Sequence, residues 1–188
     1  MKKQIENNLE EKQLKSKVVF DGNLLHVKSD TILLPNGKES TREYIEHVGA
    51  ACIVAITDKN EIIVEKQYRY PFHRVITEIP AGKLNFKDED PLLAAKRELK
   101  EETGYTAKTW HYLGTYYPSC AYSDEKIAIY LARDLETGNQ NLDDDEFLQV
   151  ELIPFQEFLN DIFSGKICDG KTQSAVLLAH NFMKQDPQ

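Results

Sequence analysis

Short runs of hydrophobic residues, separated by polar turns, recur through most of the chain and indicate a strand-rich domain. Residues 49–56 contain the nearly continuous apolar run AACIVAI, and residues 61–67 alternate apolar and polar positions. A continuous apolar run of this length is typical of a strand buried on both faces, and alternation is typical of a strand with one face in the core. We therefore predict two central strands here and further strands at residues 75–79, 110–117, 126–132 and 148–153.

The first 48 residues have a different pattern, which predicts an antiparallel strand module. Residues 1–16 are charged and only weakly periodic, so we expect a frayed or loosely helical lead-in. Further on, Pro35-Asn36-Gly37-Lys38 predicts a hairpin turn, because Asn-Gly readily adopts positive φ. We expect short strands at residues 18–20, 24–27, 31–34 and 41–47, with the main domain over residues 49–188.

Three segments have signals of helices. Asp90 followed by Pro91 predicts a helix start, and Thr103-Gly104 predicts its end, because glycine accepts the left-handed conformation that closes a helix. Apolar positions spaced three and four apart predict an amphipathic helix over residues 154–163 and another over residues 172–182. One central helix among strands, with two helices near the C-terminus, predicts an α+β fold with a mixed sheet between helices.

Composition narrows the range of functions. The chain has 188 residues, 41% of them hydrophobic, which suits one domain or one domain with a small extension. A net charge of −8 without a run of Lys and Arg argues against nucleic acid or a membrane surface as a partner. The polar N-terminus and widely spaced Cys52, Cys120 and Cys168 fit a cytoplasmic protein with reduced thiols.

The central helix carries an unusual concentration of carboxylates. Beside the apolar stripe that contains Leu99, Glu98, Glu101 and Glu102 share an arc of the helix surface. Like charges three and four residues apart destabilise a helix by roughly a few tenths of a kcal/mol per pair, so a cation should offset them. Mg²⁺ or Mn²⁺ is the natural candidate, since hard cations prefer carboxylate and phosphate oxygens.

The alternative is a solvated acidic face on which Arg97 pairs with Glu101. An arginine that precedes a glutamate by four residues is the weaker orientation for a helical ion pair. This pair therefore gives a poor structural reason for the cluster, and we favour a metal site.

The stretch of residues 82–105 resembles the Nudix box, the loop-helix-loop motif of hydrolases that cleave nucleoside diphosphates linked to another group. One residue more than usual separates Gly82 from Glu89, so either the loop has an insertion within residues 85–88, which we favour, or Asp88 replaces the glutamate. The resemblance implies the Nudix fold, with its mixed sheet between helices. It rests on Gly82, Glu89, Arg97-Glu98-Leu99, Glu101-Glu102 and Gly104-Tyr105.

The resemblance also implies a metal site. Two or three Mg²⁺ ions, or Mn²⁺ in their place, are expected to bind at the box. Their expected ligands are the carboxylates of Glu98, Glu101 and Glu102 and the backbone carbonyl of Ala81. Such ions would neutralise a pyrophosphate and clamp the attacking and leaving oxygens.

A second acidic run, at residues 142–147, reads on composition as a solvated turn before a strand. In the resembled enzymes a loop at this position closes over the substrate and supplies the general base or a further metal ligand. Glu146 is the best match for that carboxylate, and Asp144 is the second. From the box itself, Glu101 and Arg97 complete the expected catalytic residues.

Other segments resemble ADP-ribose pyrophosphatases in particular. The arginine of QYRYP that grips substrate corresponds to Arg69, and the glutamate of EIPAG near the nucleotide corresponds to Glu78. The N-terminal module resembles the region that dimerises these enzymes, so we expect a homodimer in which Arg42 reaches the partner's site. In the loop that shapes the substrate site, Cys120 and Ala121 stand where the subfamily usually has proline and glycine.

The expected reaction is metal-dependent hydrolysis of ADP-ribose to AMP and ribose 5-phosphate. Two alternatives stay open: another nucleoside diphosphate sugar, such as an ADP-sugar or GDP-mannose, and a non-catalytic Nudix domain that binds nucleotides. A non-catalytic domain is expected to lack one or more of the box glutamates, and all of them are present.

Residues 165–172, GKICDGKT, also match the GxxxxGK[ST] pattern of a phosphate-binding P-loop. A P-loop follows a buried strand and opens a helix of a parallel α/β sheet, whereas this segment follows an amphipathic helix late in a strand-rich chain. We reject the match and expect a simple connector between two helices, with no further role.

Overall fold

The computed structural model describes residues 9–142 and 146–185, which form two compact units. The N-terminal unit contains residues 9–47 together with the loop Ser119–Glu125. The second unit contains Val48–Pro118 and the described residues from Lys126 onward. The grouping of Ser119–Glu125 with the N-terminal strands was not predicted from the sequence.

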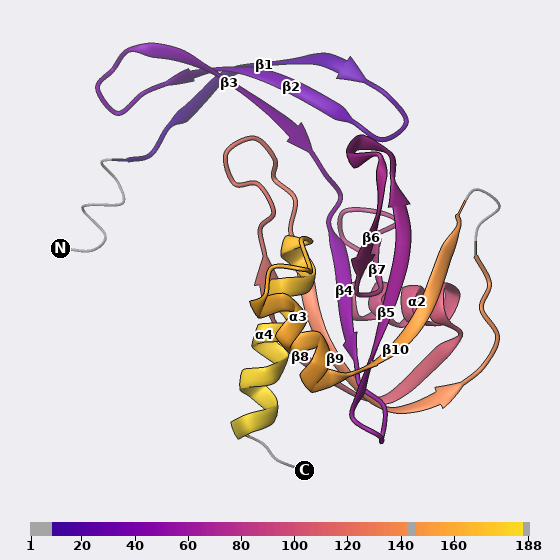
Figure 1. The fold of residues 1–188 in the computed structure, drawn as a ribbon. Helices are drawn as coiled ribbons and strands as arrows, with labels where there is room; N and C mark the ends of the chain where they lie inside the picture. Colours follow the sequence, from indigo (N-terminus) through magenta and orange to yellow (C-terminus); the bar gives the residue numbers. More distant parts are fainter. Residues whose placement is uncertain (1–8, 143–145, 186–188) are drawn as a thin grey trace. The chain divides into compact units, whose positions relative to one another are not determined.

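The N-terminal unit is a three-stranded antiparallel sheet of β1 (Lys12–Asp21), β2 (His26–Leu33) and β3 (Glu39–Glu46), in that order (Figure 1). The predicted hairpin turn is confirmed, with Gly37 at φ 81° and its N–H donating to the Leu34 carbonyl. The loosely helical lead-in was wrong from Lys12 onward. Pairing with β2 satisfies the backbone of this polar segment, which local periodicity does not reveal.

Two other expectations for this unit need correction. Residues 24–27 and 31–34 do not form separate strands, because the single strand β2 runs unbroken from His26 to Leu33 and so joins the two segments. The loop Ser119–Glu125 is held to the end of β3 by backbone bonds: Ile45 N–H donates to the Tyr122 carbonyl over 2.9 Å. The carboxylate of Asp124 also accepts the N–H of His47 over 2.7 Å.

The second unit contains two sheets. The four-stranded mixed sheet has the order β7-β4-β9-β8, and its only parallel pair among the described strands is β4 with β9. The three-stranded sheet has the antiparallel order β10-β5-β6, with β5 in the centre. The strands are β4 (Ala50–Ala55), β5 (Glu61–Arg69), β6 (Arg74–Glu78), β7 (Ala81–Lys83), β8 (Tyr105–Tyr116), β9 (Ile127–Thr137) and β10 (Leu148–Pro154).

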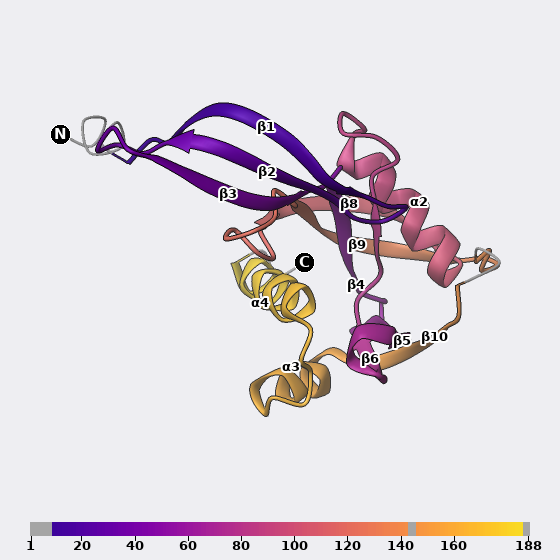
Figure 2. The same ribbon diagram turned by 90° about the horizontal axis from the view of Figure 1, so that it is seen from above.

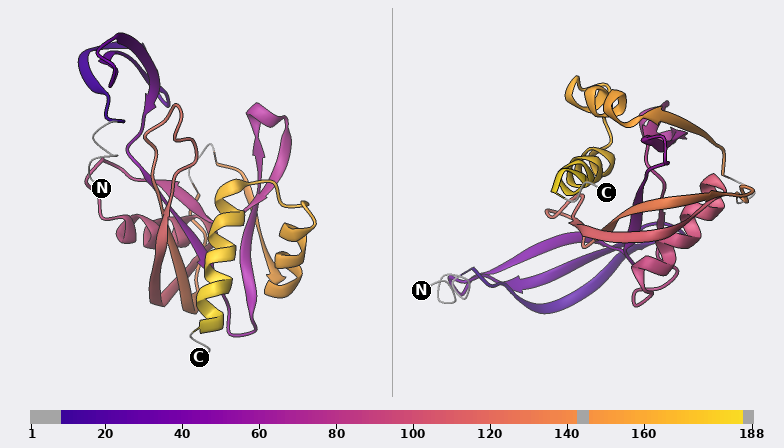
Figure 3. Two further views of the ribbon diagram at one scale, coloured as in Figure 1. Left: turned by 90° about the vertical axis from the view of Figure 1, so that its left-hand side faces the viewer. Right: turned by 90° about the horizontal axis from the view of Figure 1, so that it is seen from below.

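Helices cover both faces of the four-stranded mixed sheet, as predicted (Figures 2 and 3). Alternate residues of β4 explain why: Cys52 and Val54 pack in one core with α3 and α4, whereas Ala51 and Ile53 pack in the other core with α2. Buried apolar area on both faces is the main stabilising term for such a layer. The helices are α2 (Pro91–Thr103), α3 (Phe155–Phe163) and α4 (Gly170–Gln185), and a short 3₁₀ helix η1 (Tyr70–Phe72) follows β5.

Helix α2 begins and ends where the sequence predicted. Asp90 caps it, since its carboxylate accepts the N–H of Leu92 over 2.9 Å, and Gly104 closes it at φ 76°. An N-cap of this kind contributes about 1 kcal/mol. Strands β8 and β9 are longer than predicted, because their hairpin pairing extends to Tyr105 opposite Thr137. No helix in the described ranges is long and apolar enough to span a membrane.

Candidate active site

Helix α2 turns its carboxylates to one edge of the core, as its periodicity predicted. Ala95 and Leu99 are fully buried and anchor the helix, and Glu102 on the neighbouring arc is also buried. The Glu98 side chain is 16% exposed and that of Glu101 is 43% exposed. The three predicted ligands therefore differ, with Glu98 and Glu102 inside and Glu101 near solvent.

Strand β7 fits closely against these carboxylates. A Cβ atom at Gly82 would overlap the carboxylate of Glu98, so only glycine leaves room for that group. The N–H of Ala81 donates to Glu102 Oε2 over 3.0 Å. The structure thus brings together Ala81, Glu98 and Glu102, which the sequence analysis assigned to one metal site.

Arg97 forms hydrogen bonds to residues on and beside the loop before α2. Its guanidinium donates to Glu89, to the Lys83 carbonyl over 3.0 Å and to Glu98 over 3.1 Å. Its separation from Glu101, the partner in the solvated-face alternative, is longer, at 3.8 Å. Glu89 also accepts the N–H of Asn85. These contacts support an insertion in the loop, because Glu89 is the carboxylate that meets Arg97.

Sequence analysis missed Glu65, a buried carboxylate on β5. Its Oε1 has no hydrogen-bond partner among the described residues. It is directly opposite Glu78 of β6 in the strand register. The signal for it was present: Glu65 lies two residues after Ile63, which packs in the core of α2, so strand alternation turns both residues to that side.

Four carboxylates, Glu65, Glu98, Glu102 and Glu146, share one electrostatic neighbourhood, and we call them the carboxylate cluster. Burial raises the pKa of Glu102, and the charges of Glu65, Glu98 and Glu146 raise it further. Burial followed by the charge of Glu146 likewise raises the pKa of Glu65. Burial raises the pKa of Glu98 against the opposing hydrogen bond from Arg97.

Glu146 precedes β10, and its negative charge raises the pKa of each of the other three carboxylates. Its proximity to them depends on the pairing of β10 with β5, so the resemblance predicted it and local periodicity did not. Asp144, the second choice for the loop carboxylate, lies outside the described residues.

The cluster suits a divalent cation. In the described part of the chain, no three His, Cys, Asp or Glu side chains are arranged as a ready metal-binding group. The donor set is nevertheless all carboxylate, Glu65 carries an orphaned buried oxygen, and Gly82 leaves a cradle around Glu98. Mutually repelling buried carboxylates with raised pKa values require a proton or a cation, and hard cations favour such oxygens.

Arg69 and Glu78 form a bidentate ion pair. Arg69 Nε donates to Glu78 Oε1 over 2.6 Å, and Nη2 donates to Oε2 over 2.8 Å. Burial acts to raise the pKa of Glu78, but the bond from Arg69 and the charge of Lys171 outweigh it, so the pKa lies below its ordinary value. Arg42 lies on β3 of the N-terminal unit, where it pairs with Glu11.

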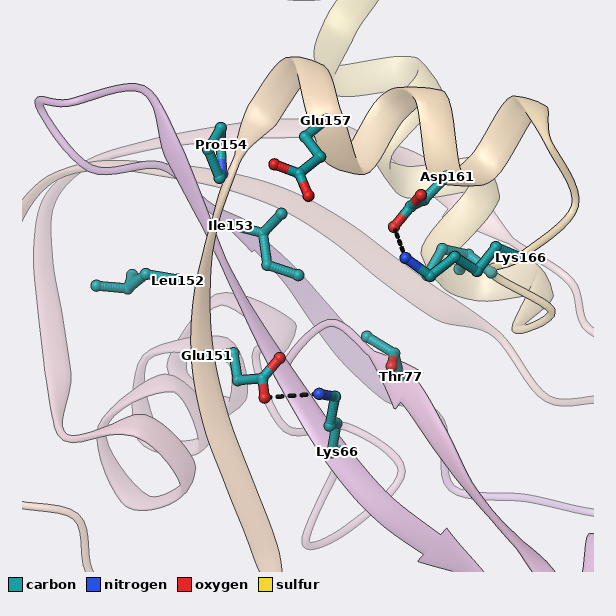
Figure 4. A pocket seen from close by; sticks show the side chains of 10 residues that line it. Lys66, Thr77, Glu151, Leu152, Ile153, Pro154, Glu157, Asp161 and Lys166 are labelled. Atoms are coloured by element: carbon teal, nitrogen blue, oxygen red, sulfur yellow. Dashed lines mark hydrogen bonds and ion pairs between the residues drawn. The ribbon is translucent and has the colours of Figure 1, made fainter.

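A separate pocket of about 450 Å³ lies beside α3, β10 and β6 (Figure 4). Its two lysines already have carboxylate partners, Lys66 with Glu151 and Lys166 with Asp161, both over 2.6 Å. None of the predicted site residues lines it. We assign it no ligand.

Comparisons with known proteins identify the family of the chain. The NUDIX domain profile matches residues 46–180, and that of the nucleoside diphosphate sugar hydrolase N-terminal domain matches residues 11–45. An ADP-ribose pyrophosphatase of Bacillus subtilis is 40% identical over 90% of this chain and 92% of its own. A methanol dehydrogenase activator of Bacillus methanolicus is 41% identical over 89% and 91%. A crystal structure of an ADP compounds hydrolase shares the fold, with TM-score 0.82 and 24% identity over 94% and 96%.

Proposed function

Because the chain belongs to the Nudix family and carries the N-terminal domain of nucleoside diphosphate sugar hydrolases, we propose that it hydrolyses ADP-ribose to AMP and ribose 5-phosphate. The observation that carries this proposal is the carboxylate cluster. Its member Glu65 is directly opposite Glu78 in the register of β5 and β6, and Glu78 is the partner of Arg69. The 40% identity to an ADP-ribose pyrophosphatase favours ADP-ribose over other nucleotide sugars.

Nudix hydrolases generally use divalent metal ions, and the residues here fit them. Glu98, Glu101, Glu102 and the carbonyl of Ala81 would hold two or three Mg²⁺ or Mn²⁺ ions, and the orphaned oxygen of Glu65 adds a further donor. When bound, such ions neutralise the pyrophosphate and promote ionisation of a water molecule. Binding in turn neutralises carboxylates that otherwise repel one another.

Two groups of the chain itself have roles in the proposed reaction: Glu146 accepts a proton from the attacking water, and Arg69 binds the substrate. The oxygen of a water molecule bonds to one phosphorus while the bond from that phosphorus to the bridging oxygen breaks. Glu146 accepts the proton of the water, and the bridging oxygen leaves on the other phosphate. Arg69 keeps Nη1 outside its bidentate bond to Glu78, so that nitrogen can donate to a substrate oxygen.

Substitutions in the acidic loop test the role of Glu146. General bases typically contribute about 10² to 10⁴ in rate, so Glu146→Gln should lower kcat by that factor and change KM much less. Asp144→Asn is the matched control. If Asp144→Asn is the crippling change, the assignment within the loop is wrong; if both variants are fully active, the base lies in the box, with Glu101 the first to replace.

The decisive experiment measures nucleoside monophosphate release from ADP-ribose, other ADP-sugars and GDP-mannose, with Mg²⁺ or Mn²⁺. We expect the highest kcat/KM for ADP-ribose and no turnover in EDTA. Preference for another nucleotide sugar would replace the substrate and keep the reaction class. Binding without release of any monophosphate would point instead to a non-catalytic nucleotide-binding domain.

A homodimer through the N-terminal unit is part of the proposal. Every residue of β1 is exposed, and this edge strand and the turn after it carry Leu14, Val18, Val19, Phe20 and Leu24. An exposed apolar edge strand is a typical surface for association. In the dimer, Arg42 would bind substrate in the partner's site. Light scattering that shows a fully active monomer at micromolar concentration would contradict this arrangement.

A second candidate follows from the 41% identity to a methanol dehydrogenase activator. Adding the protein to a methanol dehydrogenase and measuring its rate tests this candidate directly. Running the same assay with Glu98→Gln shows whether any activation depends on the carboxylate cluster. Activation that survives this substitution would separate the two functions.

A further inference from the structure

Glu78 has two cationic partners, one nine residues away in sequence and the other 93 residues away. Arg69 binds it from β5, and Lys171 Nζ of α4 donates to its Oε2 as well. Glu78 and Lys171 are 93 residues apart in sequence. The second cation, Lys171, lies outside both the box and the segments QYRYP and EIPAG, so neither motif predicted its bond to Glu78.

The Lys171 ammonium is largely shielded from solvent and donates to two carboxylates. Its side chain is 12% exposed, that of Glu78 is 7% exposed, and Nζ also donates to Asp169 Oδ2 over 2.9 Å. Arg69, Glu78, Lys171 and Asp169 therefore form a chain of alternating charges with no net charge. Removing one member of such a chain leaves a buried charge without its counterion, which is strongly unfavourable.

The start of α4 holds this lysine in a fixed place. Asp169 Oδ2 accepts both the N–H of Thr172, over 3.0 Å, and its hydroxyl, over 2.6 Å. The fully buried Thr172 hydroxyl oxygen in turn accepts the N–H of Ile79 over 3.0 Å. The helix is thus tied to the residue that follows Glu78, and Lys171 has little freedom to move away.

These contacts correct one expectation and confirm another. Residues 165–172 follow α3 and open α4, so they are not a P-loop after a strand, as predicted. The expectation of a simple connector with no further role was wrong, because Lys171 and Thr172 both bind β6 and its continuation. Local sequence pattern could not show these two bonds, since each joins residues that are 93 positions apart.

We propose that Lys171 is a positioning residue: it fixes the Glu78 carboxylate from α4, and Glu78 in turn orients Arg69 toward an anionic oxygen of the substrate. This inference rests on the proposed function. In this proposal Lys171 acts through Glu78 and does not itself bind the substrate, since its two bonds go to Glu78 and Asp169. Its effect is therefore expected in substrate binding, through Arg69, and not in the chemical step.

The test compares Lys171→Met, which keeps the stem and removes the charge, with Lys171→Arg, which keeps the charge. Lys166→Met is the matched control, since Lys166 lies on the same segment and is 68% exposed. We expect Lys171→Met to raise KM for ADP-ribose about ten- to a hundredfold, as for a displaced binding group, with kcat changed less than about threefold. Lys171→Arg should recover most of the loss, and Lys166→Met should match the wild type.

A double variant separates positioning from a general structural effect. In an Arg69→Met background, Lys171→Met should raise KM less than about twofold further, because residues that act through one another are not additive. Thermal melting establishes that each variant is folded before kinetics are compared. An equal effect of Lys171→Met with and without Arg69, or a wild-type KM in Lys171→Met, would overturn the inference.

The two proposals fail in different ways. Wild-type release of AMP from ADP-ribose together with a silent Lys171→Met refutes only the positioning role. A wild-type protein that hydrolyses none of the nucleotide sugars refutes the proposed function, and the positioning role with it.

Discussion

Gly82 of β7 leaves the space that the Glu98 carboxylate occupies, since a Cβ atom at position 82 would overlap that group. The Glu98 side chain is flexible and can turn aside, so Gly82→Ala should leave the melting temperature nearly unchanged. The displaced carboxylate should nevertheless lower kcat about a hundredfold, because misplacement by about 1 Å has effects of this size. Steady-state kinetics and thermal melting check both parts, and wild-type turnover in a folded Gly82→Ala protein would contradict them.

Neutralising the inner carboxylates of α2 should separate activity from stability. We expect Glu98→Gln and Glu102→Gln each to lower turnover by about 10² or more, as for loss of a group that acts in the transition state. In the metal-free protein the melting temperature should stay unchanged or rise slightly, because like charges on one helix face are removed.

Glu136→Gln is the control for these two variants, since Glu136 is an exposed glutamate that pairs with Lys108 and does not belong to the carboxylate cluster. Turnover by the wild type that persists in EDTA would exclude the metal role of both glutamates.

Glu65 is expected to contribute to metal affinity although it lies outside the box. Glu65→Gln should weaken Mn²⁺ binding about ten- to a hundredfold, as for other groups that support a metal site. It should also raise the melting temperature of the metal-free protein, because burial and the charge of Glu146 raise the pKa of Glu65 to about 8, which makes this carboxyl unfavourable in the folded state, and a neutral amide removes that cost.

Direct Mn²⁺ titration, without substrate, is the measurement for Glu65. Glu61→Gln, at the other end of β5, is the matched control. Unchanged Mn²⁺ affinity in Glu65→Gln would show that Glu65 shapes the cluster without binding the ion.

The cysteines should divide into one inert and two reactive thiols. Burial raises the pKa of Cys52 from 9.0 to about 12, against the opposing charge of Lys171, whereas Cys120 and Cys168 are exposed. At pH 8 a thiol reagent should therefore label two cysteines in the native protein and the third only after unfolding.

The pH dependence of Cys52 has a definite sign. Its folded pKa lies above its unfolded pKa, so its contribution to the free energy of unfolding is complete below about pH 9 and is lost as the pH rises toward 12. Denaturant unfolding of Cys52→Ala and wild type across this range measures the difference. In the labelling experiment, rapid reaction of all three thiols in the native protein would contradict the burial of Cys52.

The sequence by itself determined the features that depend on neighbouring residues. The Asp90 cap, the Gly104 terminus and the Asn36-Gly37 turn were all predicted, because capping and turn formation involve groups only a few residues apart. The burial of β4 on both faces was also predicted, from its continuous apolar run. The arc that carries Glu98 and Glu102 followed from helix periodicity alone.

Only the tertiary structure decided which distant groups meet. Glu65 looked like an ordinary polar strand residue, and its place opposite Glu78 and close to Glu102 follows from the central position of β5 between β10 and β6. Lys171 looked like a connector residue until α4 brought it to Glu78. Electrostatic and hydrogen-bonding partners of buried charges are chosen by spatial proximity, and no local propensity records a pairing between residues 93 positions apart.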